Sequence, residues 1–262
     1  MTMSGEVKPM PEVVSMLHNP TIEKLKDMKL KTMAQMATDP ALKELSFEER
    51  LALMVEKEWL RRKNNRIKRL LRKASLVLNA CLEDIDYANE RKIDQKTIQT
   101  LSGCTFIEQK LNIILSGKTG TGKSFLACAL GNRACRYGYT VKYYRMPELL
   151  LEIQVAKNAN EYLRLMEALR KVRLLILDDV GLTSYTLEES RDILEIAEGR
   201  YNRSSTLLAG QMPHTHWYDL FPDPALADAI MDRLIHNAYI LPLDSPRSMR
   251  EVMAEKTLQE IK

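Results

Sequence analysis

From residue 111 onward, short apolar runs alternate with segments whose apolar residues recur at helical spacing. The runs read "LNIIL", "VKYYR", "LLILDD", "TLLAG" and "AYILPL". Strands that alternate with helices in this way are typical of a parallel sheet covered by helices on both faces. The pattern therefore predicts an α/β fold with a five-stranded parallel sheet.

The first 100 residues show a different pattern, in which only helices are predicted. Residues 1–20 contain three prolines and little periodicity, which indicates a flexible arm. Residues 21–37 carry apolar residues at mostly helical spacing and predict one helix. After Pro40, Ser46 and Glu49 form the pattern of a capping box, which opens a further helix. We expect that helix to continue into the basic stretch "EWLRRKNNRIKRLLRK".

This basic stretch holds most of the uneven charge of the chain. From Lys57 to Lys73 there are nine Lys or Arg residues and one acid, whereas the whole chain has a net charge of +4. On a helix, one arc of about 120° gathers the apolar residues Trp59, Leu60, Ile67, Leu70, Leu71 and Ala74. The cations lie outside this arc, except Lys63. The stretch is therefore an amphipathic helix with an apolar stripe and a basic face.

Like charges one turn apart destabilise a helix, so a polyanion or an acidic protein surface is expected to compensate them. We favour nucleic acid over a solvated or protein-facing helix and over a membrane surface. The candidate DNA-binding residues are Arg61, Arg62, Lys63, Arg66, Lys68, Arg69, Arg72 and Lys73.

Cysteine usage and hydropathy restrict the class of protein further. The four cysteines form no C-x-x-C pair, so neither a disulfide framework nor a zinc site is indicated. No signal peptide is recognisable, and no apolar run reaches the roughly 18 residues of a membrane helix. These features predict a soluble cytosolic protein.

The clearest motif is "GKTGTGKS" between a predicted strand and a predicted helix, which fits G-x-x-x-x-G-K-[ST]. Its glycines let backbone N–H groups point at phosphate, Lys123 adds a charge for the β- and γ-phosphates, and Ser124 offers a hydroxyl to Mg²⁺. The motif predicts ATP and Mg²⁺ as ligands. The predicted ATP-binding residues here are Gly117, Lys118, Thr119, Gly120, Thr121, Gly122, Lys123, Ser124 and Phe125.

A second motif, "VRLLILDDVG", places two carboxylates at the end of a buried strand. Parallel sheets bind ligands at the carboxyl ends of their strands. We expect Asp178 to hold Mg²⁺, and Asp179 to orient or deprotonate the water that attacks the phosphate.

Three further residues are candidates for contact with the nucleotide. Gln211 follows the run "TLLAG" and could sense the γ-phosphate, although an ordinary strand–loop junction is an equal alternative. Arg233 has no acidic residue three or four positions away on its own helix, so its guanidinium could contact the nucleotide of a neighbouring subunit. Arg250 follows the last strand and could reach the nucleotide of its own subunit.

Together the P-loop, "LLILDD", "AGQMP" and "DRLIHNA…SMR" resemble an AAA+ ATPase of the initiator and loader group. The segments "LSFEERLALMVEKEWLRRKNNRIKRLLRKA" and "LEDIDYANERKID" resemble one branch, the IstB-like ATP-binding helper proteins of bacterial insertion sequences. The resemblance covers about residues 22–255.

The resemblance implies non-sequence-specific binding of duplex DNA and ATP-dependent homo-oligomers with ATP between subunits. It also implies selection of target DNA and activation of a partner transposase in the bacterial cytoplasm, at the nucleoid. The arginine finger given in trans falls on Arg233, and the sensor-2 arginine falls on Arg250. DNA-stimulated ATP hydrolysis with Lys123, Asp179 and Arg233 as catalytic residues is the expected activity.

The sequence departs from the AAA+ pattern at three places. Asp179 replaces the usual Glu, which implies slow turnover. Gly210 occupies the sensor-1 position, with Gln211 beside it. Only 19 residues follow "AYILPL", which are too few for a C-terminal lid domain. The IstB-like and loader branches also lack that lid.

The expected organisation is an arm over 1–20, a helical DNA-binding domain over 21–78 and an AAA+ ATPase domain over 79–262. Two other classes of protein stay open. A DnaC-like helicase loader would use its N-terminal region to hold a helicase. A small-molecule P-loop kinase would need a lid segment, which the sequence does not show.

Overall fold

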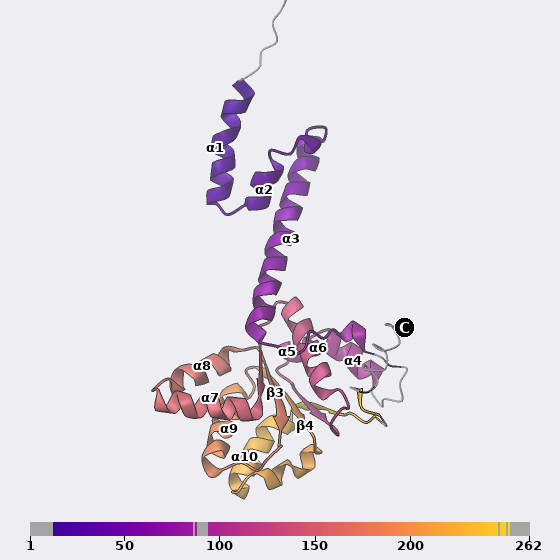
Figure 1. The fold of residues 1–262 in the computed structure, drawn as a ribbon, viewed down its shortest axis with the longest axis vertical. Helices are drawn as coiled ribbons and strands as arrows, with labels where there is room; N and C mark the ends of the chain where they lie inside the picture. Colours follow the sequence, from indigo (N-terminus) through magenta and orange to yellow (C-terminus); the bar gives the residue numbers. More distant parts are fainter. Residues whose placement is uncertain (1–12, 86, 88–93, 246, 250, 252–262) are drawn as a thin grey trace, which may run out of the picture. The chain divides into compact units, whose positions relative to one another are not determined.

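The computed structural model describes residues 13–85, 87, 94–245, 247–249 and 251 (Figure 1). The chain divides into two compact units, residues 1–66 and residues 67–262. The division falls inside helix α3 (Phe47–Ala74), upstream of the domain boundary at residue 78 that the sequence suggested. Among the described residues, no helix is long and apolar enough to cross a membrane.

The first unit contains α1 (Val13–Asp27), α2 (Lys31–Met36), the short 3-10 helix η1 (Pro40–Leu42) and the first part of α3. The prediction of one helix over 21–37 is wrong. The segment contains parts of two helices, α1 and α2, because Lys29 between them adopts a left-handed conformation with φ of 59°. The backbone N–H of Leu30 then donates to the Leu25 carbonyl at 2.8 Å, which closes the end of α1. The chain reverses at this residue and continues as α2.

The arm expected over residues 1–20 is too long, since α1 begins at Val13 and includes Pro20. Inside a helix, proline removes one backbone hydrogen bond and its ring crowds the carbonyl four residues earlier, although its φ is close to the helical value. Pro20 therefore lies within α1 at a cost, and Pro9 and Pro11 precede the described residues.

The capping box at the start of α3 is confirmed. The Ser46 N–H and hydroxyl donate to Glu49 Oε2 at 2.9 and 2.8 Å, and the Glu49 N–H donates to Ser46 Oγ at 3.3 Å. The hydrogen bond from the Ser46 side chain holds the pKa of Glu49 below its usual value. From this cap the helix runs for 28 residues, through the whole basic stretch.

Glu58 joins α3 to α2 within the first unit. It is 3% exposed, and its carboxylate accepts hydrogen bonds from Arg61 Nη2 at 2.5 Å and from Arg62 Nε at 2.8 Å. The backbone N–H of Thr32 donates to the same carboxylate at 3.0 Å. These bonds, led by that from Arg61, lower the pKa of Glu58 to about 2. Part of the charge compensation that the basic stretch requires therefore comes from inside the unit.

We predict that Glu58→Gln destabilises the first unit by about 2 kcal/mol, because hydrogen bonds to charged groups contribute roughly 1.5–3 kcal/mol. The pKa of Glu58 is lowered on folding, so its contribution is complete above about pH 4.5 and is lost as pH falls toward 2. Denaturant titrations of helical circular dichroism at pH 7 and pH 3 measure both effects. The control is Glu56→Gln, an exposed carboxylate on the same helix. Equal stability of the two variants at pH 7 would contradict the prediction.

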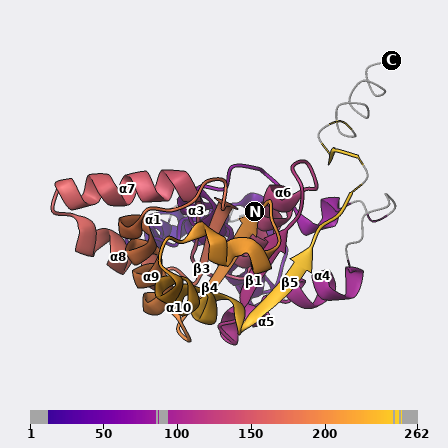
Figure 2. The same cartoon turned by 90° about the horizontal axis from the view of Figure 1, so that it is seen from below.

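The second unit is built on the five-stranded parallel sheet that the sequence predicted (Figure 2). Its strands are β1 (Asn112–Ser116), β2 (Val141–Arg145), β3 (Leu174–Val180), β4 (Ser205–Gly210) and β5 (Ala238–Pro242), in the order β2-β3-β4-β1-β5. Since all neighbours are parallel, their carboxyl ends meet at one edge. This order places β1 and β3 on either side of β4.

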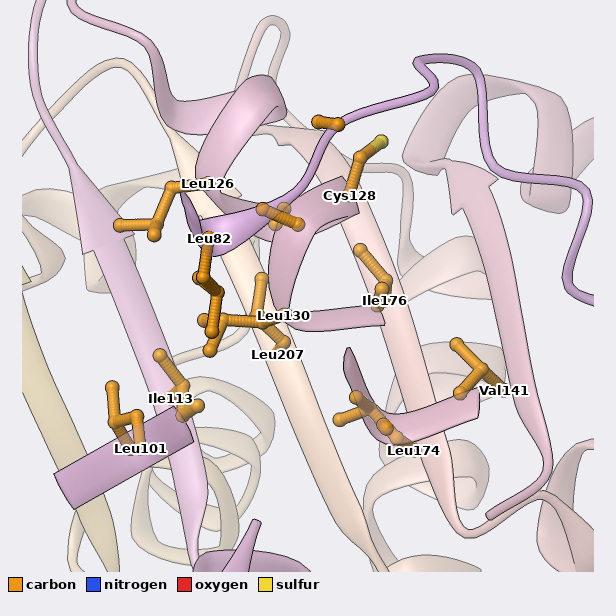
Figure 3. Close-up of a cluster of buried hydrophobic side chains, with 14 of the residues drawn as sticks. Leu82, Leu101, Ile113, Leu126, Cys128, Leu130, Val141, Leu174, Ile176 and Leu207 are labelled. Carbon is orange, nitrogen blue, oxygen red and sulfur yellow. The ribbon is translucent and has the colours of Figure 1, made fainter. Parts of the chain in front are cut away.

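Helices cover both faces of the sheet and bury two apolar clusters, as expected. One face carries η2 (Leu82–Asp84), α4 (Gln95–Ser102), α5 (Thr105–Glu108) and α6 (Lys123–Arg136). Figure 3 shows Leu130 of α6 beside Leu207 of β4, in the same cluster as Leu126 and Ile113. The other face carries α7 (Met146–Asn158), α8 (Tyr162–Lys171), α9 (Leu187–Arg200), η3 (His214–Leu220) and α10 (Pro224–Ile235).

The apolar stripe of α3 is buried only toward its C-terminal end. Leu70 and Ala74 belong to the first of the two clusters, with Leu71 packed against it. Trp59 and Leu60, at the other end of the stripe, are exposed. In the first unit α3 contacts α2 through Glu58, which lies on another side of the helix. The Lys63 ammonium covers the Trp59 ring instead, 4.9 Å from its centroid.

Candidate nucleotide-binding site and basic helix

The loop between β1 and α6 has the backbone conformation of an anion-binding turn. Gly120 and Gly122 adopt φ values of 85° and 92°, which side chains rarely allow. Gly122 is the N-cap of α6, and no side chain caps that helix. The first N–H groups of a 14-residue helix therefore face the loop, where a phosphate would satisfy them.

Lys123 holds this loop together from inside. Its side chain is largely buried, and its ammonium donates to the carbonyls of Gly117 at 2.6 Å and Lys118 at 2.9 Å. The Thr121 hydroxyl also donates to the Lys118 carbonyl. Lys118 and Thr119 are exposed at the tip, whereas Ser124 and Phe125 are half-buried in the first turn of α6. The buried ammonium thus lies where phosphate oxygens could replace carbonyl oxygens as its acceptors.

The segment after β5 packs on the same loop. The Leu243 N–H donates to the Ser116 carbonyl at 2.7 Å, and the Met249 N–H donates to the Gly120 carbonyl at 2.8 Å. A Cβ atom at Gly120 would lie 2.5 Å from Ser248 Oγ, so only glycine fits there. Ser248 is a neighbour of the site that the sequence did not reveal. Arg250, the predicted sensor-2 residue, lies outside the described residues, as does most of the segment on which the expected absence of a lid depends.

The two carboxylates occupy the carboxyl end of β3, as the sequence predicted. Asp178 is 3% exposed and accepts hydrogen bonds from the Tyr143 hydroxyl at 2.8 Å and from the Asp179 N–H at 2.9 Å. The register with β4 shifts between Leu177 and Val180, and Asp179 has φ of 58°. Burial, with the charge of Asp178, raises the pKa of Tyr143, which stays a donor to that carboxylate. Asp178 is therefore fixed, and Asp179 is turned out of the strand.

Arg145 at the end of β2 is bound to Asp179. Its Nε donates to Asp179 Oδ2 at 2.7 Å, and Glu148 lies 3.5 Å from its Nη1. Asp179 also lines a groove of about 580 Å³ between α7 and the start of α9. The sequence did not reveal Arg145, because only the strand order shows that β2 lies beside β3.

Gly210 ends β4 beside both motif-bearing strands. It lies opposite Ser116 of β1 and Val180 of β3. A Cβ atom there would lie 2.9 Å from the Val180 carbonyl and 3.0 Å from the Trp217 ring. Close packing thus explains why residue 210 is a glycine. Gln211 follows as an exposed residue at the same edge.

Arg233 lies at the opposite edge of the sheet from the P-loop. Its backbone carbonyl accepts from the Asn112 side chain at the start of β1, whereas the P-loop follows the end of β1. Its guanidinium pairs with Glu198 of α9 at 2.9 Å and donates to the Ala229 carbonyl. The sequence correctly showed no acid on its own helix face, but α9 supplies one. Arg233 cannot serve the nucleotide of its own subunit.

The eight basic residues assigned to DNA are not equivalent. Arg61 and Arg62 are bound to Glu58 and also donate to the Lys29 carbonyl. Lys63 lies over Trp59. The other five, Arg66, Lys68, Arg69, Arg72 and Lys73, are exposed along α3.

The oxygen donors near the P-loop suit a hard cation. Ser124 offers a hydroxyl and Asp178 a carboxylate, and Mg²⁺ is commonly held by one or two protein oxygens together with substrate phosphates. The described residues contain no cluster of three or more metal-ligating side chains. The donor set therefore fits a cation that arrives with a nucleotide.

The sequence is similar to those of ATP-binding proteins from bacterial insertion sequences. The sequence profile of the family described as "IstB-like ATP binding protein" matches residues 22–257. The chain is 39% identical to an insertion sequence ATP-binding protein of Sinorhizobium fredii, over 92% of this chain and 100% of that protein. It is 38% identical to the ATP-binding protein of insertion sequence IS1162 from Pseudomonas fluorescens, over 76% and 88% of the two chains.

Solved structures resemble this chain in fold over about two thirds of its length. The crystal structure of DnaI gives a TM-score of 0.55 at 19% identity, covering 68% of this chain and 94% of that one. The replication initiator DnaA bound to AMPPCP and single-stranded DNA gives 0.56 at 20% identity, covering 71% and 56%. At these identities the likeness concerns the fold alone, which is that of AAA+ P-loop proteins.

Proposed function

Since the chain belongs to the family of IstB-like ATP-binding proteins, we propose that it is an insertion-sequence ATPase that assembles on duplex DNA. In this proposal ATP, bound with Mg²⁺, drives oligomerisation. The oligomer selects and remodels target DNA and recruits or stimulates the partner transposase. ATP hydrolysis then releases the assembly.

One observation carries the proposal: an insertion sequence ATP-binding protein matches the chain at 39% identity over its own full length. The match therefore includes the basic helix as well as the P-loop. A helicase loader of similar AAA+ fold would share the P-loop without requiring the basic helix.

The residues of the site have distinct roles in this mechanism. The N–H groups at the start of α6 and the Lys123 ammonium bind the phosphates. Ser124 and Asp178 would hold Mg²⁺, which would supply positive charge to the β- and γ-phosphates when bound. Asp179 orients the attacking water, and Gln211 lies at the same edge as a candidate contact to the γ-phosphate.

Arg233 completes a neighbouring subunit's site in this proposal. It lies about 15 Å from its own P-loop, the length of a five-residue strand, so a role in hydrolysis requires a second copy. Its pairing with Glu198 would break as the subunits meet. Hydrolysis is therefore expected to increase with protein concentration.

The basic face of α3 is the proposed contact to the DNA backbone. Phosphate contacts of this kind carry no sequence information and weaken steeply with salt. Target preference would then come from how easily a sequence bends.

Sedimentation velocity with a duplex of about 50–60 base pairs tests the proposal, with and without a non-hydrolysable ATP analogue. We expect large protein–DNA particles only with the nucleotide.

Replacing Lys68, Arg69, Arg72 and Lys73 by Ala should weaken duplex binding about 10- to 100-fold and flatten its salt dependence. These four residues are preferable to Arg61 and Arg62, whose loss would leave Glu58 unpaired. A duplex that never co-sediments would favour a helicase loader instead.

We predict that Arg145→Met raises the basal rate of ATP hydrolysis by about threefold to tenfold. The ion pair at 2.7 Å holds the Asp179 carboxylate toward Arg145 of β2, so the carboxylate is less available to orient the attacking water. Steady-state phosphate release without DNA measures the effect. Arg164→Met, which removes an exposed arginine of α8, is the control. A rate that falls with Arg145→Met would show that the arginine positions Asp179 productively.

A further inference from the structure

The first unit carries an open basin whose lining is almost entirely cationic. Lys29, Lys31, Arg61 and Arg62 line it, together with Met28, and its volume is about 560 Å³. We propose that this basin binds a phosphodiester of the nucleic-acid backbone. The inference rests on the proposed function and deepens it, because it assigns Lys29, in the turn before α2, and Lys31, the first residue of α2, to the DNA interface.

The two arginines of the basin are already fixed in position. Glu58 accepts from Nε of both, and the Lys29 carbonyl accepts from Nη2 of both, at 3.1 and 3.3 Å. Within the described part of the chain, no acceptor is found for Nη1 of either residue. Each guanidinium therefore retains donors for a ligand, and little side-chain entropy is lost when the ligand binds.

The left-handed turn at Lys29 brings the lysines to the arginines. α1 ends at Asp27, Lys29 follows with φ of 59°, and α2 starts two residues later at Lys31. After the reversal, the Lys29 carbonyl accepts hydrogen bonds from Arg61 and Arg62, and the Thr32 N–H donates to Glu58. Residues about 30 positions apart in sequence thus form one surface lined by four cations, of which Arg61 and Arg62 are paired with the buried Glu58 carboxylate.

The shape and charge of the basin favour a polyanion over a small ligand. The basin is shallow and wide, so a single nucleotide would stay largely in water, whereas a chain of phosphates would cross it. Arg61 and Arg62 also belong to the run of cations on α3, and a backbone bound in the basin would meet Lys63 and Arg66 next on the same helix. Fixed guanidinium groups suit phosphate oxygens, which they bind as a fork.

The test compares two double variants that remove the same charge. Lys29→Ala with Lys31→Ala removes both basin lysines, and Lys24→Ala with Lys43→Ala removes two exposed lysines of the same unit outside the basin. The full-length proteins are titrated with a fluorescent duplex of about 50 base pairs at several salt concentrations, in the presence of a non-hydrolysable ATP analogue. Circular dichroism verifies that both variants keep wild-type helix content.

We expect the basin variant to bind duplex about 5- to 20-fold more weakly, with a salt slope reduced by about one to two, and the control to bind within about twofold of wild type. Equal affinities of the two variants would overturn the inference while leaving the proposed function intact. A wild-type protein that binds no duplex would overturn both. Weaker binding of the basin variant with an unchanged salt slope would also overturn it, because no phosphate contact would then have been lost.

Discussion

Lys123→Ala is expected to lower ATP hydrolysis by about 100- to 1,000-fold and to abolish nucleotide-dependent assembly on DNA. The ammonium is buried inside the loop, where it is the charge best placed to meet the β- and γ-phosphates. Without it, two loop carbonyls each lose one hydrogen bond, so the loop that should hold the phosphates is itself weakened. Phosphate release and sedimentation with the ATP analogue measure the two effects.

The matched control for this variant is Lys118→Ala in the same loop. Its side chain is exposed, and the contact seen in the structure is made by its backbone carbonyl. We expect this variant to retain hydrolysis and assembly within a fewfold of wild type. Nucleotide-dependent assembly that survives Lys123→Ala would contradict the role of ATP as the trigger of oligomerisation.

Arg200→Ala is expected to destabilise the second unit by about 3 kcal/mol or more. The guanidinium is 2% exposed and donates to the carbonyls of Leu169, Val172 and Ser205 and to the Thr206 hydroxyl. Burial lowers its pKa to about 9, which shows how unfavourable the site is for a charge. Its hydrogen bonds offset that cost by joining the end of α8 to the start of β4. Removing the side chain leaves buried carbonyls without donors and opens a cavity.

Chemical denaturation at pH 7, followed by circular dichroism, measures this loss of stability. Arg191→Ala is the control, because Arg191 is exposed on the same helix. A loss below about 1 kcal/mol for Arg200→Ala would mean that water reaches the freed carbonyls. The effect should appear without DNA or nucleotide, since Arg200 lies away from the P-loop edge of the sheet.

The elements whose signals are local were predictable from the sequence. The five strands, the P-loop, the Asp178–Asp179 pair and the capping box at Ser46 depend on neighbouring residues, through periodicity, glycine conformation and side-chain caps. Each of these patterns is written within a few positions of the chain. The break at Lys29 was missed, because a lysine in a left-handed conformation has no sequence signature comparable to that of glycine.

Contacts between distant segments were decided by the tertiary structure alone. Arg145 reaches Asp179 because β2 lies beside β3, and Glu198 reaches Arg233 because α9 packs on α10. The same holds for the basin, where a reversal of the chain brings Lys29 to Arg61. The sequence by itself determined which chemical groups this protein carries and which element each belongs to. Which of them pair, and which stay available to a ligand, depends on strand order and helix packing, since charges act through distances in space rather than along the chain.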